Sequence, residues 1–266
     1  MRIICLVKLV PDVENFKYDY EKNVLVRSNV HQLINPEDAT ALAFALSVKG
    51  VAPDTSIETV TMAPKGAIPH LEDLLRRGVD RATLISDPRF LGSDTYVTSR
   101  VLARYLSRSS YDCILTGTHT LDGGTAHVPA QVAELLGLPH LSHVADPDAD
   151  ALTGNPVTVE LETDEEVLTF EIDLPGIIGF AYSTKRKLPY IEYENLSLDV
   201  SDRIDIVTND DLGFKEGDVG LDGSPTTVAG VEVKTLERKD TTLLKTDDDG
   251  IEAVYRFLNE KGFLRR

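Results

Sequence analysis

The part of the chain best suited to hold a charged ligand is a glycine-rich turn at residues 117–125, with the sequence GTHTLDGGT. It stands between a strand-like apolar run and a stretch with helical periodicity. Main-chain N–H groups at the start of such a helix lack intrahelical partners, and Gly123 and Gly124 carry no side chains that would obstruct them. The turn could therefore bind a pyrophosphate, and Asp122 could accept a hydrogen bond from a ribose hydroxyl group or from the amides of the turn itself.

A purely structural interpretation of these residues is equally open. A glycine-rich turn between a strand and a helix is often only a tight connection, and this one is neither a G-x-G-x-x-G motif nor a P-loop. Taken alone, Asn35 is better explained as a helix N-cap and Met62 as a core residue. Asp94 and Thr95 are likewise explained as the start of a helix.

Metal and nucleophilic chemistry find little support in the sequence. His140 and His143 could in principle bind a metal, but their segment has no cysteine partner and no zinc-site spacing, so we expect no metal site. The chain has no Gly-x-Ser-x-Gly elbow, and no Ser or Cys lies in a recognisable triad context. A hydrolytic enzyme is therefore the weakest of the functional classes considered.

The candidate residues must be positioned by strands and helices that alternate through the first 145 residues. Strand-like runs cover residues 2–10, 56–63, 82–86 and 112–116, and helices are predicted after Asn35-Pro36, over residues 65–78, after Ser93-Asp94-Thr95 and up to Gly137. Four β–α units in succession predict a doubly wound, mostly parallel sheet with helices on both faces, a three-layer α/β fold of the adenine-nucleotide-binding type. In such sheets, ligands bind beyond the carboxyl ends of the strands, near the topological switch point.

The pattern changes after Asp150. Alternating runs at residues 156–161 and 166–173 predict an antiparallel hairpin, and residues 176–183 predict another strand. From about residue 185 the chain is polar, apart from a last amphipathic helix with Ile251, Val254 and Leu258 on one face. We therefore expect an α/β nucleotide-binding domain at residues 1–184. Residues 185–266 are expected to form a partner-recognition loop and a C-terminal arm that packs on another chain.

The amino-acid composition argues against several classes of binding partner and location. The 266 residues include 27 Lys and Arg against 44 Asp and Glu, a net charge of −17 that argues against binding nucleic acid or an anionic membrane. No apolar run approaches the ~20 residues that a membrane span needs. Cys5 and Cys113 both lie in strand-like runs, so we expect free thiols and a cytoplasmic protein.

Six motifs along the chain resemble those of the β subunit of the electron-transferring flavoproteins. They are Val7-Lys8 with Pro11-Asp12 (V-K-x-V-P-D), Ile34-Asn35-Pro36-Glu37-Asp38 (I-N-P-x-D), Val60-Thr61-Met62-Ala63-Pro64 (V-T-M-G-P), Gly92-Ser93-Asp94-Thr95 (G-A-D-T), Leu121-Asp122-Gly123-Gly124-Thr125-Ala126 (I-D-G-D-T-A) and Gly220-Leu221-Asp222-Gly223-Ser224-Pro225-Thr226 (G-L-x-G-S-P-T). Each motif alone is weak, but six in this order are highly specific and span nearly the whole chain.

The resemblance implies a heterodimer with a homologous α subunit, which the C-terminal arm of this chain would wrap. In ordinary members of the family the β subunit holds a structural AMP. In electron-bifurcating members it holds a second FAD, to which NADH delivers a hydride and from which electrons pass to a high- and a low-potential acceptor. Asp94-Thr95 and Asp122-Gly123-x-Thr125-Ala126 resemble the bifurcating group. The resemblance thus implies FAD as cofactor, NAD as transient substrate and ferredoxin as possible acceptor.

The positions of the motifs also imply which residues contact the cofactor. Amides of Gly123 to Ala126 would hold the pyrophosphate. Leu6, Asn35 and Met62 would frame the adenosine, and Asp94, Thr95 and Thr98 would lie near the ring or ribityl end. The full expected set is Leu6, Asn35, Met62, Asp94, Thr95, Thr98, Asp122, Gly123, Gly124, Thr125, Ala126, His127, Val128 and Gln131.

The sequence departs from the bifurcating pattern at Thr118-His119-Thr120, at Gly124 and at Pro129-Ala130. The family's partner-docking stretch is also altered, to Lys187-Leu188-Pro189-Tyr190-Ile191, which motivates the hypothesis of a partner other than the usual acyl-CoA dehydrogenase. A flavin-dependent lactate dehydrogenase is the first candidate. Two alternatives stay open: a non-bifurcating β subunit with AMP that serves an acyl-CoA dehydrogenase, and a universal-stress-type nucleotide-binding regulatory protein.

Overall fold

The computed structural model describes residues 1–12, 17–19, 24–26, 31–145, 147–163, 165–181, 186–227 and 243–264. The chain divides into two compact units, Met1–Thr227 and Val228–Arg266, which are described separately. The predicted boundary after residue 184 is a statement about function and stays a prediction.

The first unit is built on a nine-stranded sheet with the strand order β11-β10-β9-β12-β8-β1-β6-β7-β13. Its strands are β1 (Arg2–Leu6), β6 (Ser56–Met62), β7 (Arg81–Ile85), β8 (Cys113–Gly117), β9 (His140–Val144), β10 (Val157–Glu162), β11 (Val167–Ile172), β12 (Ile177–Phe180) and β13 (Ile204–Val207). All pairings are parallel except those of β10, which runs antiparallel to β9 and to β11. The predicted mostly parallel, doubly wound sheet is confirmed.

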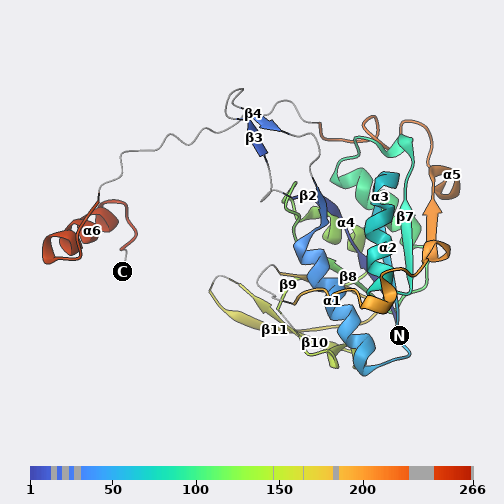
Figure 1. Cartoon of the computed structure of the whole chain (residues 1–266), viewed down its shortest axis with the longest axis horizontal. Coiled ribbons are helices and arrows are strands. Elements are labelled where there is room, and N and C mark those ends of the chain that lie inside the picture. The colour runs from blue at the N-terminus through green and yellow to red at the C-terminus, as the bar shows by residue number, and fades with distance from the viewer. Residues whose placement is uncertain are drawn as a thin grey trace. The chain divides into compact units, whose positions relative to one another are not determined.

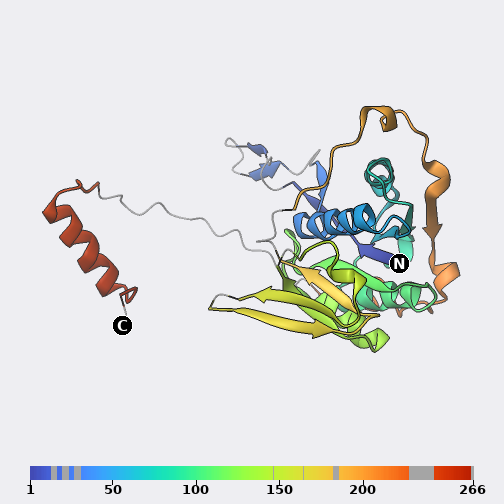
Figure 2. The same ribbon diagram turned by 90° about the horizontal axis from the view of Figure 1, so that it is seen from below.

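Helices cover both faces of this sheet (Figures 1 and 2). One apolar core lies under α1 (Pro36–Val51) and α2 (Ile68–Arg76), and a second lies under α3 (Thr95–Leu106) and α4 (His127–Leu136). The strands feed both cores, because successive side chains alternate between the faces: Ile3 and Cys5 of β1 belong to the first core, Ile4 and Leu6 to the second. Because helices cover both faces of the sheet, its central strands are buried on both sides, and the unit has three layers.

The remaining short elements lie around this framework. They are the strand pairs β2 (Leu9–Pro11) with β5 (Gln32–Ile34) and β3 (Lys17–Asp19) with β4 (Val24–Val26), the 3₁₀ turns Lys65–Ala67, Pro88–Phe90, Ala151–Thr153, Tyr193–Asn195 and Ser201–Arg203, and the short helix α5 (Asn209–Leu212). The second unit contains α6 (Asp248–Glu260), whose first turn is capped by the Asp247 carboxylate on the N–H of Gly250 at 3.0 Å. No helix in the described residues has the length and apolar character needed to span a bilayer.

Three features of the fold differ from the predicted elements. The first strand ends at Leu6, and the chain then turns to form β2, because the N–H of Lys8 bonds to the Asp38 carboxylate rather than to a neighbouring strand. β9 is a strand that the sequence pattern did not predict. β13 joins the sheet edge beside β7, although it lies in the range predicted to form the arm.

Candidate functional site

The chain order of the strands reverses between β1 and β8, so the carboxyl ends of these two strands mark the topological switch point. One carboxylate ties both ends together. Asp38, in the first turn of α1, accepts hydrogen bonds from the N–H of Lys8 at 2.8 Å and from the N–H of Gly117 at 2.9 Å. Burial raises the pKa of Asp38 to about 7, even though these two bonds favour its ionised form.

The neighbouring carboxylate, Glu37, holds the next part of the same loop. The N–H of His119 donates to one Glu37 oxygen, and the His119 imidazole Nδ1 lies 3.7 Å from the other. Glu37 and Asp38 lie in the first turn of α1, at the positive end of that helix. Their carboxylates also reach across to the end of β8 and the start of the following loop, which fixes the backbone at residues 117–119.

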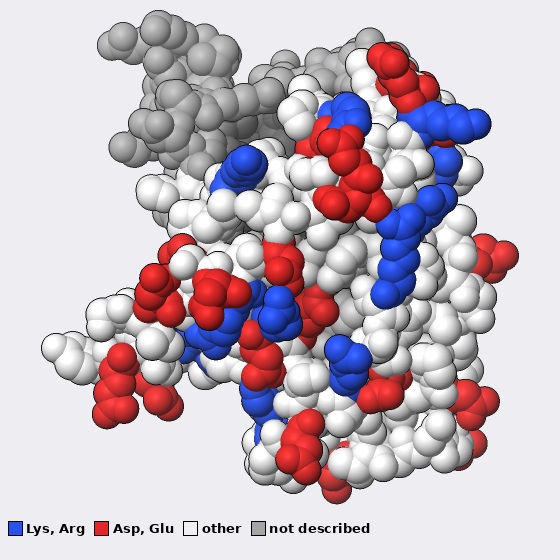
Figure 3. Space-filling view, turned by 90° about the vertical axis from the view of Figure 1, so that its right-hand side faces the viewer, with Lys and Arg blue, Asp and Glu red and all other residues white. Residues whose placement is uncertain are grey.

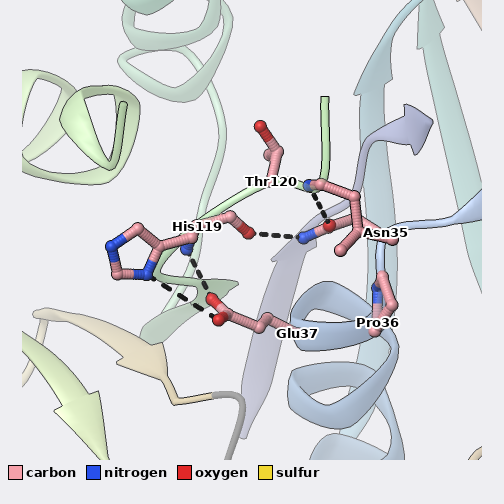
Figure 4. Close-up of a pocket in the computed structure, with 6 residues that line it drawn as sticks. Asn35, Pro36, Glu37, His119 and Thr120 are labelled. Carbon is pink, nitrogen blue, oxygen red and sulfur yellow. Dashed lines mark hydrogen bonds and ion pairs between the residues drawn. The ribbon is translucent and has the colours of Figure 1, made fainter. Parts of the chain in front are cut away.

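Asn35 completes this arrangement and lies beside a hollow of about 270 Å³ (Figure 4). Its side chain is 1% exposed; Nδ2 donates to the carbonyl of His119 at 2.7 Å, and Oδ1 accepts from the N–H of Leu121 at 3.2 Å. Asn35 does occupy the N-cap position of α1, as predicted, but its side chain makes no capping bond. It braces the loop after β8 instead.

The turn that follows is exposed from Leu121 to Thr125. Asp122 forms an ion pair with Lys8, whose Nζ lies 2.7 Å from Oδ2 and 2.8 Å from Oδ1, and it also accepts from the N–H of Gly123 at 2.7 Å. Burial alone would raise the pKa of Asp122, but the hydrogen bonds from Lys8 and Thr120 keep it below the ordinary value. The pair joins the end of β1 to the turn across the switch point.

The start of α4 is open. Ala126 precedes the helix in the left-handed region (φ 55°), and α4 has neither a side-chain cap nor an acidic residue in its first turn. The N–H groups at this helix start are therefore not satisfied by a capping side chain, and the positive end of the helix dipole faces the exposed turn. An anion with several acceptor oxygens fits this arrangement.

The other predicted residues lie at the starts of α3 and α4 and on the adjoining core. Asp94 caps α3, with Thr95 and Thr98 in the first turns of that helix. Ser99 Oγ donates to Gln131 Oε1 at 2.9 Å, which joins the first halves of α3 and α4. Leu6, Met62 and Val128 belong to the apolar cluster beneath these helices. The structure thus brings the predicted residues to the end of the sheet at which β1 and β8 have their carboxyl ends. Asn35 lies on the side of this region that α1 covers.

Sequence reasoning missed the roles of Lys8, Glu37 and Asp38. All three belong to the motifs V-K-x-V-P-D and I-N-P-x-D, which was the available signal. Their partners include the end of β8 and the loop after it, far along the chain, and no local pattern indicates that pairing.

Two of the histidines lie in contact with each other. Rings of His119 and His143 meet edge to face with centroids 5.2 Å apart, and burial lowers the pKa of His140. The described residues contain no group of three or more His, Cys, Asp or Glu side chains that could hold a metal ion. Cys5 and Cys113 are buried free thiols, as predicted.

Acidic and basic side chains are interspersed over the face of the molecule shown in Figure 3. The side chain of Arg186 is partly buried and is held by other parts of the chain. Its guanidinium donates to Ser47 Oγ at 2.5 Å and to the carbonyl of Pro147 at 3.1 Å, and it stacks over Phe44.

Comparison with known proteins gives one family. The family model described as "Electron transfer flavoprotein domain" matches residues 22–176. The chain is 27% identical over 265 residues to electron transfer flavoprotein subunit beta of Thermoanaerobacterium thermosaccharolyticum, covering 98% of this chain and 99% of the relative. It is 29% identical over 283 residues to the subunit of the same name from Megasphaera elsdenii, covering 98% and 97%. It is 33% identical over 232 residues to caffeyl-CoA reductase-Etf complex subunit CarD of Acetobacterium woodii, covering 86% of each chain.

Proposed function

The chain belongs to the electron transfer flavoprotein family as a β subunit, and from this premise we propose that it binds FAD at the carboxyl end of its sheet and acts in electron bifurcation. NADH is the proposed electron donor, with a partner flavin dehydrogenase and ferredoxin as acceptors. Family membership decides against the universal-stress-type alternative.

The observation that carries this proposal is the open start of α4 beside the exposed turn at Leu121–Thr125. The turn and helix start offer main-chain N–H groups to a diphosphate, and Lys8 supplies a cation at the same edge. Gly123 and Gly124 leave room for phosphate oxygens: a Cβ at either position would meet nothing closer than 3.7 Å. These features fit the diphosphate of a dinucleotide.

The remaining candidate residues fit the two ends of such a cofactor. Leu6, Met62 and Val128 provide apolar surface at the carboxyl ends of β1 and β6 and the start of α4. Thr95 and Thr98, in the first turns of α3, offer hydroxyl groups for the ribityl or ring end. When bound, FAD supplies the one- and two-electron chemistry, and the protein contributes binding, orientation and electrostatics.

The rival within the family is a structural AMP at the same helix start. AMP has one phosphate and lacks the ribityl chain and isoalloxazine ring that FAD would place near α3, so it would leave Thr95 and Thr98 without a ligand. We favour FAD because α3 lies against α4 through the Ser99–Gln131 bond, so these two hydroxyl groups stand on the helix next to the proposed phosphate site.

The proposed partner is a flavin dehydrogenase that docks near residues 187–191. Tyr190 is 94% exposed and Tyr193 is 89% exposed, an unusual exposure for two aromatic side chains. CarD, a relative, is named for its caffeyl-CoA reductase complex. A lactate dehydrogenase remains our first candidate because the family's docking sequence is altered, and an acyl-CoA dehydrogenase is the alternative. Recovery with an acyl-CoA dehydrogenase and no oxidation of hydroxy acids would eliminate the lactate proposal.

The test of the cofactor is to co-express the chain with its α subunit and count flavins per heterodimer. Two FAD molecules, with bleaching of the visible flavin bands on anaerobic addition of NADH, would support the proposal. One FAD together with one AMP would refute FAD binding by this chain while leaving its family membership intact. Two FAD molecules without bleaching would refute the NADH-linked bifurcating role.

A further inference from the structure

Two segments far apart in the sequence interlock at the start of α3. The first, residues 89–94, connects β7 to α3, and the second, residues 219–226, ends one residue before the boundary of the first unit at Thr227. The second segment carries the motif G-L-x-G-S-P-T, to which the proposed cofactor site gives no role.

Asp94 is the centre of this contact. Its Oδ1 accepts from the N–H of Val97 at 3.0 Å and so caps α3. Its Oδ2 accepts from both the N–H and the hydroxyl of Thr226, at 3.0 Å and 2.7 Å. The N–H of Asp94 in turn donates to Ser224 Oγ at 2.9 Å. Both carboxylate oxygens are therefore engaged by this chain, and we call Asp94, Ser224 and Thr226 the latch.

The backbones beneath the latch pack closely. The N–H of Leu221 donates to the carbonyl of Leu91 at 3.0 Å. Gly220 has φ +67°, and a Cβ there would lie 2.3 Å from the carbonyl oxygen of Arg89. Only glycine allows this approach. The presence of glycine at this position of the motif is therefore explained by the close contact of its backbone with the segment that leads into α3.

Two arginines of α3, and Arg108 just after this helix, hold the stretch of chain that precedes the second segment. Arg100 donates to the carbonyl of Asp218 at 3.0 Å, Arg104 to that of Leu212 at 3.2 Å and Arg108 to that of Asp211 at 2.5 Å. The guanidinium groups of Arg100 and Arg104 also stack on the ring of Phe214. The chain from α5 to Thr226 is therefore held along α3, and the latch lies at the end of this stretch, next to the end of the first unit at Thr227.

We propose that Ser224 and Thr226 are positioning residues, which hold Asp94 and thereby the start of α3 and also anchor the end of the first unit at Thr227. The end of this unit and the ring end of the cofactor site then share one anchor. Loosening the latch frees residues 222–227 and disturbs Thr95 and Thr98 together. Asp94 acts through this anchor rather than as a direct contact of the cofactor. The part that concerns the cofactor rests on the proposed function, whereas the anchoring of the end of the first unit does not.

The experiment uses the full chain in a heterodimer with its α subunit. Thr226→Val removes the hydroxyl donor, Ser224→Ala removes the acceptor of the Asp94 N–H, and Thr226→Ser should restore the contact. Thr227→Val is the matched control, because its side chain makes no bond to Asp94. Hydrogen–deuterium exchange is followed in peptides covering residues 95–98 and 222–227, and the Kd for FAD is measured by fluorescence titration.

We expect Thr226→Val to raise exchange in both peptides about tenfold and to weaken FAD binding about fivefold, as loss of a hydrogen bond to a charged group predicts. Thr226→Ser and Thr227→Val should behave as the wild type. Unchanged exchange in Thr226→Val and Ser224→Ala would refute the latch. Raised exchange with an unchanged Kd for FAD would refute its coupling to the cofactor. Absence of FAD from the wild-type β site would refute the proposed function, and the exchange data would still decide whether the latch exists.

Discussion

The carboxylate of Asp38 accepts a hydrogen bond from the main-chain N–H of Gly117 at 2.9 Å, which holds the end of β8 against the first turn of α1. The other carboxylate oxygen accepts from the N–H of Lys8 at 2.8 Å. Asp38 therefore fixes the spacing between the ends of β1 and β8, the two strands that flank the candidate site. Two predictions follow from this buried contact.

Substitution of Gly117 by alanine should disrupt the contact between Asp38 and the end of β8. A Cβ at this position would lie 2.5 Å from Asp38 Oδ1, 2.6 Å from Glu37 Cβ and 2.9 Å from the Asp38 nitrogen. Overpacking of this kind costs about 1–3 kcal/mol, so we expect Gly117→Ala to lower the free energy of unfolding in urea by that amount. Gly50→Ala is the control, because Gly50 lies in α1 with nothing within 4 Å of its Cβ position. It should be neutral or stabilising by up to about 1 kcal/mol. Equal stability of Gly117→Ala and the wild type would contradict the prediction.

The raised pKa of Asp38 predicts a specific dependence of stability on pH. Burial moves this pKa from 3.8 to about 7 in the folded state. Between these values the folded state keeps a proton that the unfolded state has released. The contribution of Asp38 to stability is therefore complete below about pH 4 and is lost as pH rises through 7, on the order of 4 kcal/mol in all.

Urea unfolding of the wild type and Asp38→Asn between pH 4 and 8 measures this effect. Asparagine does not titrate, and it can accept only one of the two main-chain bonds, so the variant should be less stable throughout. Its free energy of unfolding should nevertheless fall less steeply with pH than that of the wild type. Parallel curves for the two proteins would show that Asp38 is not the group responsible.

The strands and helices that carry strong local signals could be predicted from the sequence. β1, β6, β7 and β8 are apolar and β-branched because both their faces are buried, and Asn35-Pro36 marks the start of α1. β9 was missed because its sequence HLSHV has polar residues on both sides of Leu141. β13 was missed because four residues with a central Asp205 carry too little apolar periodicity. Each of these strands is defined mainly by its neighbour in the sheet.

The candidate site shows the same limit more clearly. The glycine turn and the start of α4 were found because glycines and helix starts have local signatures. The function of the Asn35 side chain was not predicted, because its partners are main-chain groups of residues 119 and 121, more than 80 positions away. The Lys8–Asp122 pair joins residues 114 positions apart. Such contacts become visible only when the sheet brings the ends of β1 and β8 together.

The backbone of Ala126 predicts a gain in stability on substitution by glycine. Ala126 has φ 55°, a left-handed conformation that costs a residue with a Cβ about 1–2 kcal/mol. Ala126→Gly should therefore raise the free energy of unfolding by about 1 kcal/mol or leave it unchanged, once the larger entropy of unfolded glycine is included. Ala130→Gly, in the interior of α4 and exposed, should instead lower it by about 1 kcal/mol. A loss of stability in both variants would contradict the assignment of strain to Ala126.

The last prediction concerns the ion pair between Lys8 and Asp122, whose Nζ and Oδ2 atoms lie 2.7 Å apart. A diphosphate bound at the start of α4 would place negative charge beside Asp122, and Lys8 is the cation positioned to compensate it. Lys8→Met should raise the Kd for FAD about tenfold at low salt in the heterodimer with the α subunit, because it removes a charge-assisted contact and leaves Asp122 uncompensated. Lys49→Met is the matched control, since Lys49 forms a similar pair with Asp80 at 2.6 Å but lies near the opposite end of α1, away from the turn.

Three further measurements separate attraction by Lys8 from simple structural damage. Removing Lys8 removes a cause of the low pKa of Asp122, so this pKa should rise in Lys8→Met. The double variant Lys8→Met with Asp122→Asn should recover part of the lost affinity, because the uncompensated charge is gone. Added salt should weaken FAD binding more in the wild type than in Lys8→Met. Equal loss of affinity in Lys8→Met and Lys49→Met, or no recovery in the double variant, would place the diphosphate away from Lys8.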